Sequence, residues 1–448
     1  MTTAPTSHES SRRRRRKNSS APWRRYLRAL GPGLVTGASD DDPSGIATYA
    51  QAGASHGFTL LWTALLTFPL MAAVQEICDR TALATGTGLG ELAAKRFGRL
   101  GRSIVTVLIV VLVVANTLNV AADLVAVGSG MHLLHAGPTW LWALLAGIAI
   151  TTLLVAGSFS RIAAVFKTLS FSLLVYLVVV VIATHHWGEV LRHTVVPDFT
   201  FNRASLALLV AILGTTISPY LFFWQSAQRL EEMRALPDGT DQARPLKTKG
   251  DREAVLKERT SRFDVFGGMA LSNVVMFAII ATAADTLHAH HEDNIQSAAQ
   301  AAKSLTPIAG HFASTIFALG FIGSGCLAIP VLAASGSVGL SGMLGKDWGL
   351  SLSPRKAPFF YGVVALGTLG GTALSLLSVN PIKLLVFVAV INGVTAAPLL
   401  FVVMRISSSR SLMGSYVNGH LATTLGWATA AVMALAAVAL FATGGVSF

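Results

Sequence analysis

Two apolar segments of this chain are each interrupted by a short polar stretch that contains a proline. The first interruption spans Ser39 to Gly45 and places three consecutive aspartates before Pro43, and the second spans Thr215 to Tyr220 around Pro219. Proline removes a backbone donor and clashes with the preceding turn, so each interruption frees carbonyl groups inside an apolar segment. Matching interruptions in two halves of a chain are typical of a secondary transporter's substrate site. The carboxylates at the first interruption indicate a cation as the bound species.

Composition places the chain in a bilayer. It is 52% hydrophobic and only 12% charged, about half the charged fraction of a soluble domain. Windows of about 20 apolar residues predict an all-α polytopic membrane protein with eleven transmembrane helices. The windows centre near Gly37, Leu70, Val114, Ala149, Leu174, Gly214, Val274, Gly320, Leu366, Ala389 and Val432.

The basic residues predict the orientation, because Lys and Arg flanks stay cytoplasmic. With the N-terminus inside, only four of the 34 Lys and Arg residues fall outside: Arg192, Arg203, Lys303 and Lys383. The N-terminus is therefore expected in the cytoplasm, the C-terminus outside, and the protein in the cell membrane. The net charge of +12 is expected to face anionic lipid. The run Arg12 to Arg16 is accordingly interpreted as a cytoplasmic tail, and no nucleic-acid partner is expected.

Helices one to five and six to ten each begin with an interrupted helix. An odd number of spans per repeat inverts the second repeat, which gives a 5+5 inverted-repeat plan. The expected divisions are a disordered basic tail (1–27), a transporter core (28–405), and a loop with an eleventh helix (406–448). The stretch from Arg229 to Arg262 is expected to be a solvated, partly helical cytoplasmic connection. Cys78 and Cys326 lie in different spans, so no disulfide is expected.

Asp42 is the leading candidate ligand, because a carboxylate near mid-membrane normally faces a cavity or a partner. Asp40 and Asp41 are expected to face a vestibule, since three adjacent acids cannot all reach one ion. The alternative is that the three form a solvated helix end. The second interruption offers the hydroxyls of Thr215 and Ser218 together with freed carbonyls. Alternatively, such hydroxyls only re-satisfy the kinked backbone.

The third apolar segment carries a polar face. Asn116, Asn119 and Asp123 are spaced three and four residues apart, so they share one side of a helix. This face is expected either to line the permeation path or to bond to a neighbouring helix. Asn392 in the tenth segment is expected to hold helices together, with contact to the site in a closed state as the alternative.

Other polar residues are assigned to the surfaces. Glu76, Asp79 and Arg80 are expected to form a surface ion-pair cluster. Six of the eight tryptophans are expected to be interfacial anchors: Trp23, Trp62, Trp140, Trp187, Trp348 and Trp427. Two histidine-rich groups on the outer side could capture metal or be ordinary polar loops: His185, His186 and His193 in one, and His288, His290 and His291 in the other.

At these residues the chain resembles the Nramp family of divalent metal transporters (natural resistance-associated macrophage proteins). The similarity runs from Gly31-Pro32-Gly33 to Asp42-Pro43, and continues through Gln51 to Ala54, Leu60 to Trp62 and Thr85-Gly86. The resemblance implies a leucine-transporter-type fold with broken helices one and six. It also implies alternating access and a metal-binding carboxylate at Asp42.

Several family positions differ in this chain. The family motif Asp-Pro-Gly-Asn reads Asp42-Pro43-Ser44-Gly45, and Met-Pro-His reads Ser218-Pro219-Tyr220. A family histidine aligns with Gln225, two family glutamates align with Asn116 and Ala126, and the family aspartate matches Asp123. The soft thioether ligand is therefore replaced by a hydroxyl, and several proton carriers are replaced by neutral residues.

The resulting candidate metal ligands are all oxygen donors. They are Asp42, Ser39, Ser44, Thr215 and Ser218, with Asp41, Asp123, Asn116, Asn119, Tyr220, Gln225 and Asn392 as candidate pathway or coupling residues. Oxygen ligands favour Mg²⁺ and Mn²⁺ over softer metals.

These residues predict an importer of divalent cations, not an enzyme, without a resident cofactor. One alternative is a proton-coupled Mn²⁺/Fe²⁺ symporter with Asp42 and Asp123 as carriers. Another is an amino-acid or organic-cation symporter on the same fold.

Overall fold

The computed structural model describes most of the chain as helices joined by short connections. The described residues are 31–156, 177–178, 180–181, 186–235, 243–248, 250–295, 297–303, 313–377 and 380–443. Within them the regular structure is helical, without a β-strand. The basic tail at 1–27 and the expected fifth span near Leu174 lie outside the described residues.

The helices fall into two series separated by residues 157–186. The first series is α3 (Pro32–Asp40), α4 (Pro43–His56), η2 (Gly57–Leu60), α5 (Trp62–Thr85), α6 (Leu89–Arg96), α7 (Arg99–Leu133) and α8 (Thr139–Ala156). The second series begins with α11 (Trp187–Val195), α12 (Arg203–Thr216), α13 (Pro219–Arg234), η4 (Leu246–Thr248), α14 (Asp251–Thr286), η5 (His288–His290) and α15 (Ala298–Lys303). It ends with α17 (Ala313–Met343), α18 (Pro358–Ser375), α19 (Pro381–Ser407), α20 (Arg410–Met413), η7 (Gly414–Tyr416) and α21 (His420–Ala442).

Ten of the eleven expected span centres fall on a described helix, and the remaining one is Leu174. Eight helical segments in this part of the chain are long and apolar enough to cross a membrane, and α12 with α13 forms one of them. A ninth candidate combines α4 and η2 with α5, across a bend of 110°. The protein is therefore a multi-pass, all-helical membrane protein.

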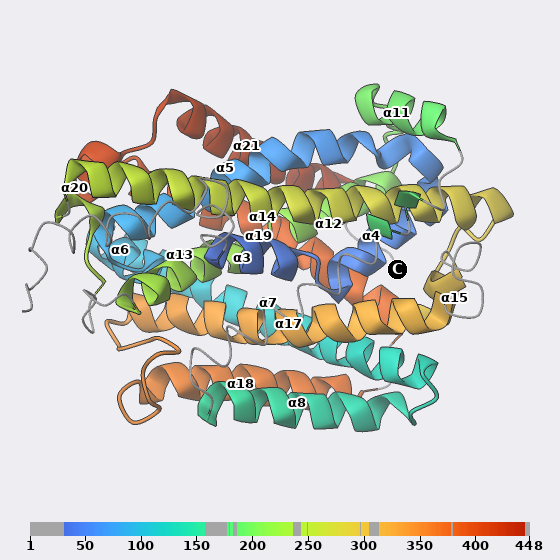
Figure 1. Cartoon of the computed structure of the whole chain (residues 1–448), viewed down its shortest axis with the longest axis horizontal. Helices are drawn as coiled ribbons and strands as arrows, with labels where there is room; N and C mark the ends of the chain where they lie inside the picture. Colours follow the sequence, from blue (N-terminus) through green and yellow to red (C-terminus); the bar gives the residue numbers. More distant parts are fainter. Residues whose placement is uncertain are drawn as a thin grey trace, which may run out of the picture.

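The two broken helices lie at the centre of the molecule. In Figure 1, α14 and α17 run along the long axis, and both contact the short helices α3 and α4. Helices α8 and α18 form an outer layer on one side, while α5 and α21 pack together on the other. Helices α6 and α20 lie at one end of the long axis, and α11 and α15 lie at the opposite end. The end with α6 and α20 is called the basic end below.

Glycines allow α3 and α14 to cross with their backbones in contact. A Cβ added to Gly268 would lie 2.0 Å from the carbonyl oxygen of Gly33, and one added to Gly37 would lie 2.1 Å from that of Gly268. The second broken helix uses the same device, because a Cβ on Gly214 would lie 2.1 Å from the carbonyl oxygen of Ala389 on α19. Small residues at such crossings let membrane helices approach closely. Each broken helix is thus held against an unbroken one by backbone contact.

The expected surface cluster on α5 is buried instead, which corrects the sequence interpretation. Glu76, Asp79 and Arg80 are 7%, 2% and 4% exposed. The connection from Arg229 to Arg262 is partly helical, as expected, because α13 extends to Arg234 and α14 begins at Asp251. The error on α5 arises because neighbouring helices at the basic end cover these three charged residues, which position along the chain does not reveal.

The glycine crossing gives a stability prediction. Replacing Gly268 with Ala should lower the free energy of unfolding by at least about 2 kcal/mol, because overpacking against backbone cannot relax by side-chain rotation. The measurement is the apparent melting midpoint of the purified full-length protein in detergent. The matched control is Gly362→Ala on α18, where an added Cβ meets nothing within 4 Å and Ala favours the helix. Equal melting midpoints for the two variants would contradict the close backbone contact between α3 and α14.

Candidate metal site

The first break is organised by Asp42. Helix α3 ends at Asp40, and α4 begins at Pro43 with Asp42 as its N-cap. Oδ1 of Asp42 accepts hydrogen bonds from the Ser44 hydroxyl at 2.5 Å and from the Gly45 amide at 2.8 Å. An aspartate cap followed by proline is a strong helix start, because proline presets the backbone angle and lacks the amide that would need a partner. The local sequence therefore determines where this helix breaks.

At the second break, the Ser218 hydroxyl is hydrogen bonded to the backbone of the break itself. Helix α12 ends at Thr216, and α13 begins at Pro219. The Ser218 hydroxyl is within hydrogen-bond distance of the carbonyls of Gly214 (2.9 Å) and Thr215 (2.7 Å). The Thr215 hydroxyl lies 3.1 Å from the hydroxyl of Tyr49 on α4. Both side chains thus satisfy groups that the broken helix frees, and Thr215 also joins the two breaks.

Tyr220 connects the breaks most directly. Its hydroxyl lies 3.1 Å from the carbonyl oxygen of Ser39 and 3.3 Å from Oδ2 of Asp42. The Ser39 side chain is used elsewhere, because its hydroxyl donates to Val35 O at 2.7 Å. Each of these groups is shielded from solvent, and Asp42 is only 2% exposed. A carboxylate oxygen, a carbonyl oxygen and a phenol oxygen therefore meet in a closed space.

Asp40 and Asp41 face α14, which corrects the expected vestibule. The Ser272 hydroxyl lies 2.7 Å from Oδ2 of Asp40 and 3.3 Å from Oδ1 of Asp41. The other oxygen of each carboxylate is buried without a hydrogen-bond partner among the described residues. Both residues are 0% exposed, so the alternative of a solvated helix end is also wrong. Asp40 and Asp41 therefore share Ser272 as a neighbour, whereas Asp42 contacts Ser44, Gly45 and Tyr220.

The polar face of α7 contacts two other helices. Asn116 donates to the carbonyl of Leu332 on α17 at 2.8 Å. Asn119 donates to the side-chain oxygen of Asn392 on α19 at 3.1 Å. Asp123 is 0% exposed, and neither of its carboxylate oxygens has a hydrogen-bond partner within the described structure. The two amides therefore join helices, whereas Asp123 remains an isolated buried acid near the first break.

Gln225 lies in a separate polar cluster nearer the basic end. Its side chain accepts a hydrogen bond from Thr36 of α3 at 2.5 Å and donates to Asp79 of α5 at 2.7 Å. The Nε of Arg229 also donates to Asp79, at 2.6 Å. Ser261 of α14 completes the surroundings of the Asp79 carboxylate. Gln225 thus links α13 to α3 and α5 rather than facing the two breaks, and α14 joins the cluster through Ser261.

Asp264 anchors the start of α3 and was not recognised from the sequence. Its carboxylate accepts from the amides of Gly31 and Gly33, both at 2.8 Å, and from that of Leu34 at 3.2 Å. The Nη2 of Arg229 lies 3.1 Å from the same carboxylate. A signal was available, because Asp264 is an acid inside the long apolar segment that also contains the paired glycines Gly267 and Gly268.

The histidine-rich groups lie away from the breaks. His186 is hydrogen bonded to Asp285 at 2.8 Å, and this bond raises the pKa of the imidazole. His288 lies 3.5 Å from Asp293. Among the described residues, no three His, Cys, Asp or Glu side chains form a group that could hold a metal. His185 lies outside the described residues. Metal capture by these histidines is therefore not supported.

Comparison with known proteins agrees with this architecture. The family model described as natural resistance-associated macrophage protein-like (Nramp) matches residues 33–443. The divalent metal cation transporter MntH of Verminephrobacter eiseniae is 28% identical over 94% of this chain and 90% of its own length. MntH of Ralstonia nicotianae is 27% identical over 92% of this chain and 90% of its own length.

Solved structures share the fold. The manganese transporter of Eremococcus coleocola superposes with a TM-score of 0.72 at 17% identity, over 95% of this chain and 88% of that one. The nucleobase-cation-symport-1 transporter Mhp1 superposes with a TM-score of 0.54 at 16% identity, over 92% and 91%. The expected leucine-transporter-type fold with broken helices one and six is confirmed. Because the family model spans nearly the whole described core, the chain belongs to the Nramp family.

Proposed function

We propose that the protein is a secondary transporter that imports divalent cations of the Mg²⁺ or Mn²⁺ class across the cell membrane by alternating access. Family membership supports a metal cargo, since the similar MntH proteins are named divalent metal cation transporters. The observation that carries the proposal is the meeting of Asp42 Oδ2, the Ser39 carbonyl and the Tyr220 hydroxyl between the two breaks.

Asp42 can offer only one of its oxygens to a cation without losing its helix cap. Oδ1 already accepts two hydrogen bonds, from Ser44 and Gly45. Oδ2 is contacted by the Tyr220 hydroxyl at the longer distance of 3.3 Å. The single hydrogen of the phenol cannot form a full hydrogen bond with both Oδ2 and the Ser39 carbonyl, so these acceptors are not fully satisfied. A cation at this position would gain oxygens from both breaks, and Ser44 would orient the carboxylate.

The donor chemistry favours a hard cation. Carboxylate, carbonyl and hydroxyl oxygens suit Mg²⁺, Ca²⁺ and Mn²⁺, whereas thioether and thiolate sulfur select softer metals. Thr215 and Ser218 would contribute through the carbonyls and hydroxyls of the second break. Since Mg²⁺ usually keeps several waters, three protein oxygens are compatible with a partly hydrated ion.

The burial of Asp42 supports alternating access. The basic end is assigned to the cytoplasm by the positive-inside rule, and this places the N-terminus inside and the C-terminus outside. Asp42 is shielded from both ends of the molecule. The half-helices on each side of the breaks would separate in turn to admit and release the ion.

A proton-coupled Mn²⁺/Fe²⁺ symporter is a second candidate, and Asp123 favours it. This carboxylate is fully buried without a hydrogen-bond partner in the described structure, and it lies within electrostatic range of Asp42. Intramembrane acids of this kind often serve as proton carriers. In this variant of the mechanism, Asp123 would release its proton when the metal leaves.

Metal competition tests the proposed cargo. In proteoliposomes at symmetric pH, excess Mg²⁺ should suppress Mn²⁺ uptake strongly and Cd²⁺ should suppress it weakly, because sulfur ligands are missing from the proposed set. Asp42→Ala should abolish uptake, whereas Asp198→Ala, at an exposed carboxylate, should leave it unchanged. Strong Cd²⁺ suppression without an effect of Mg²⁺ would favour the ordinary Nramp type, and full activity of Asp42→Ala would exclude the site.

Removing the phenol oxygen tests the role of Tyr220. Tyr220→Phe should raise the KM for Mn²⁺ about tenfold, equivalent to ~1.4 kcal/mol, because one metal ligand is lost while the ring still packs. Uptake kinetics measure this effect, and Tyr361→Phe on α18 provides the matched control, since its hydroxyl donates to the distant Leu352 carbonyl. An unchanged KM for Tyr220→Phe would show that the phenol oxygen is not a metal ligand.

Proton coupling is tested separately. Under the main proposal, Mn²⁺ entry should leave the internal pH of proteoliposomes unchanged, as reported by a trapped pH-sensitive dye. Under the symporter alternative, the interior should acidify in step with metal entry. Asp123→Asn should then abolish the acidification, because an amide cannot carry the proton. Acidification that persists in Asp123→Asn would assign coupling to another group.

A further inference from the structure

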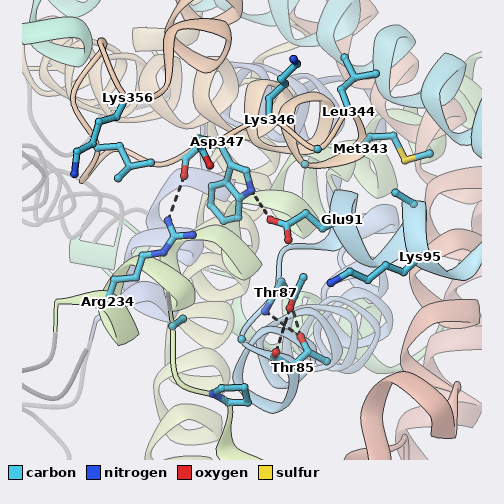
Figure 2. Close-up of a pocket in the computed structure, with 18 of the residues that line it drawn as sticks. Thr85, Thr87, Glu91, Lys95, Arg234, Met343, Leu344, Lys346, Asp347 and Lys356 are labelled. Carbon is cyan, nitrogen blue, oxygen red and sulfur yellow. Dashed lines mark hydrogen bonds between the residues drawn. The ribbon is translucent and has the colours of Figure 1, made fainter. Parts of the chain in front are cut away.

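The basic end contains a large cavity that is separate from the two breaks. Its volume is about 1020 Å³, and it is bounded by the turn between α5 and α6, by α6, by the ends of α7 and α13, and by the connection from α17 to α18. Figure 2 shows Lys95 of α6 and Arg234 of α13 reaching toward it from different walls. None of the proposed metal ligands lines it.

Most of the charged side chains that line this cavity are basic. Five basic side chains contribute to it: Lys95, Arg102, Arg234, Lys346 and Lys356. The two acids are Glu91 and Asp347. Glu91 is already engaged, because it accepts a hydrogen bond from the Trp348 indole at 2.8 Å. The cavity therefore offers an excess of positive charge to a ligand.

Trp348 gives the cavity a fixed wall. It is 3% exposed, so it is part of the packed interior and not the interfacial anchor expected from the sequence. The Arg234 guanidinium lies 4.8 Å from the centre of its ring, and Nη1 donates to its carbonyl at 3.2 Å. The Nε of Arg234 is buried, with no hydrogen-bond partner among the described residues. The buried Glu231 carboxylate also lies 3.5 Å from Nη1 of Arg234. This guanidinium is thus held in place and its charge is partly balanced, while Nε remains an unused donor in the described structure.

The adjoining turn is also preformed. Gly86 has a φ of +63°, which favours glycine, and a Cβ there would lie 2.5 Å from the Ala243 carbonyl. A Cβ on Gly88 would lie 2.7 Å from the Trp348 ring. The backbone between α5 and α6 is therefore set closely against both sides of the cavity, which limits how far the walls can collapse.

From this geometry we propose that the cavity binds the phosphate group of an anionic ligand. Arg and Lys side chains on several elements suit phosphate, because they provide charge-assisted hydrogen bonds from different directions. Bound phosphate would tie the last turn of α13 to α6 and to the connection after α17. This site is independent of the metal cargo proposed above.

Helix α7, which contributes Arg102 to the cavity, also has an exposed apolar face, so an anionic phospholipid is one source of the phosphate. Leu100, Ile104 and Val107 of α7 are 76%, 54% and 61% exposed. Arg102, which lines the cavity, lies on the same helix but on a different face, because it is two residues from both Leu100 and Ile104. A headgroup could enter the cavity while its acyl chains follow this apolar face. Free cytoplasmic phosphate is the other source of the same chemistry.

The test measures binding to the purified full-length protein in uncharged detergent at constant ionic strength. The melting midpoint is followed while dihexanoyl phosphatidylglycerol, dihexanoyl phosphatidylcholine or inorganic phosphate is titrated, since a ligand of the folded state raises it. The double variant Lys95→Gln/Arg102→Gln should weaken phosphatidylglycerol binding about 25-fold, because the loss of each basic residue is expected to weaken it roughly five-fold. The control is Arg99→Gln/Arg355→Gln, which removes two exposed charges outside the lining.

The outcomes distinguish the sources. Binding of phosphatidylglycerol, but not of inorganic phosphate, that the lining variant weakens and the control does not supports a lipid headgroup site. Binding of inorganic phosphate with the same dependence supports a soluble ligand. The proposal is overturned if neither anion binds, if phosphatidylcholine binds as well as phosphatidylglycerol, or if the control variant loses as much affinity as the lining variant.

Discussion

The carboxylate of Asp264 at the start of α3 is the interaction on which the central architecture depends. Helix α3 has only nine residues, too few to be stable in isolation. Three of its first amides point at Asp264, where the helix dipole favours negative charge. Arg229 balances that charge from α13. One side chain from α14 thus caps one half-helix and engages the other.

Under the proposed alternating access, this contact would constrain how the two breaks move. Helices α3 and α13, both on the basic side of the breaks, are joined through Arg229 and Asp264 and again through Thr36 and Gln225. On the opposite side, α4 and α12 are joined through Tyr49 and Thr215. Under alternating access, opening the basic end must separate the first pair while the second stays closed. Removing one partner of a buried ion pair costs about 3–5 kcal/mol, so this opening needs water to replace the lost contacts.

The local features of the site were predictable from the sequence, because they depend on neighbours in the chain. A proline that follows a polar residue ends one helix and starts the next, so both breaks (Asp42-Pro43 and Ser218-Pro219) and the position of Asp42 follow from short motifs. Burial was not predictable in the same way. Asp79 and Trp348 look like surface residues by position, yet helices distant in sequence cover them. Asp264 and Arg229 were missed for the same reason, since their partnership spans 35 residues.

Several buried carboxylates connect this packing to the proposed function. Asp40, Asp41 and Asp123 each have at least one buried oxygen without a hydrogen-bond partner in the described residues. An isolated ionised carboxylate in such surroundings is very costly unless a proton or a cation neutralises it. A divalent cation between the breaks would offset part of this cost in the closed state, whereas water would solvate the acids when either end opens. The same acids that attract the ion would therefore make closure around it more favourable than closure without it.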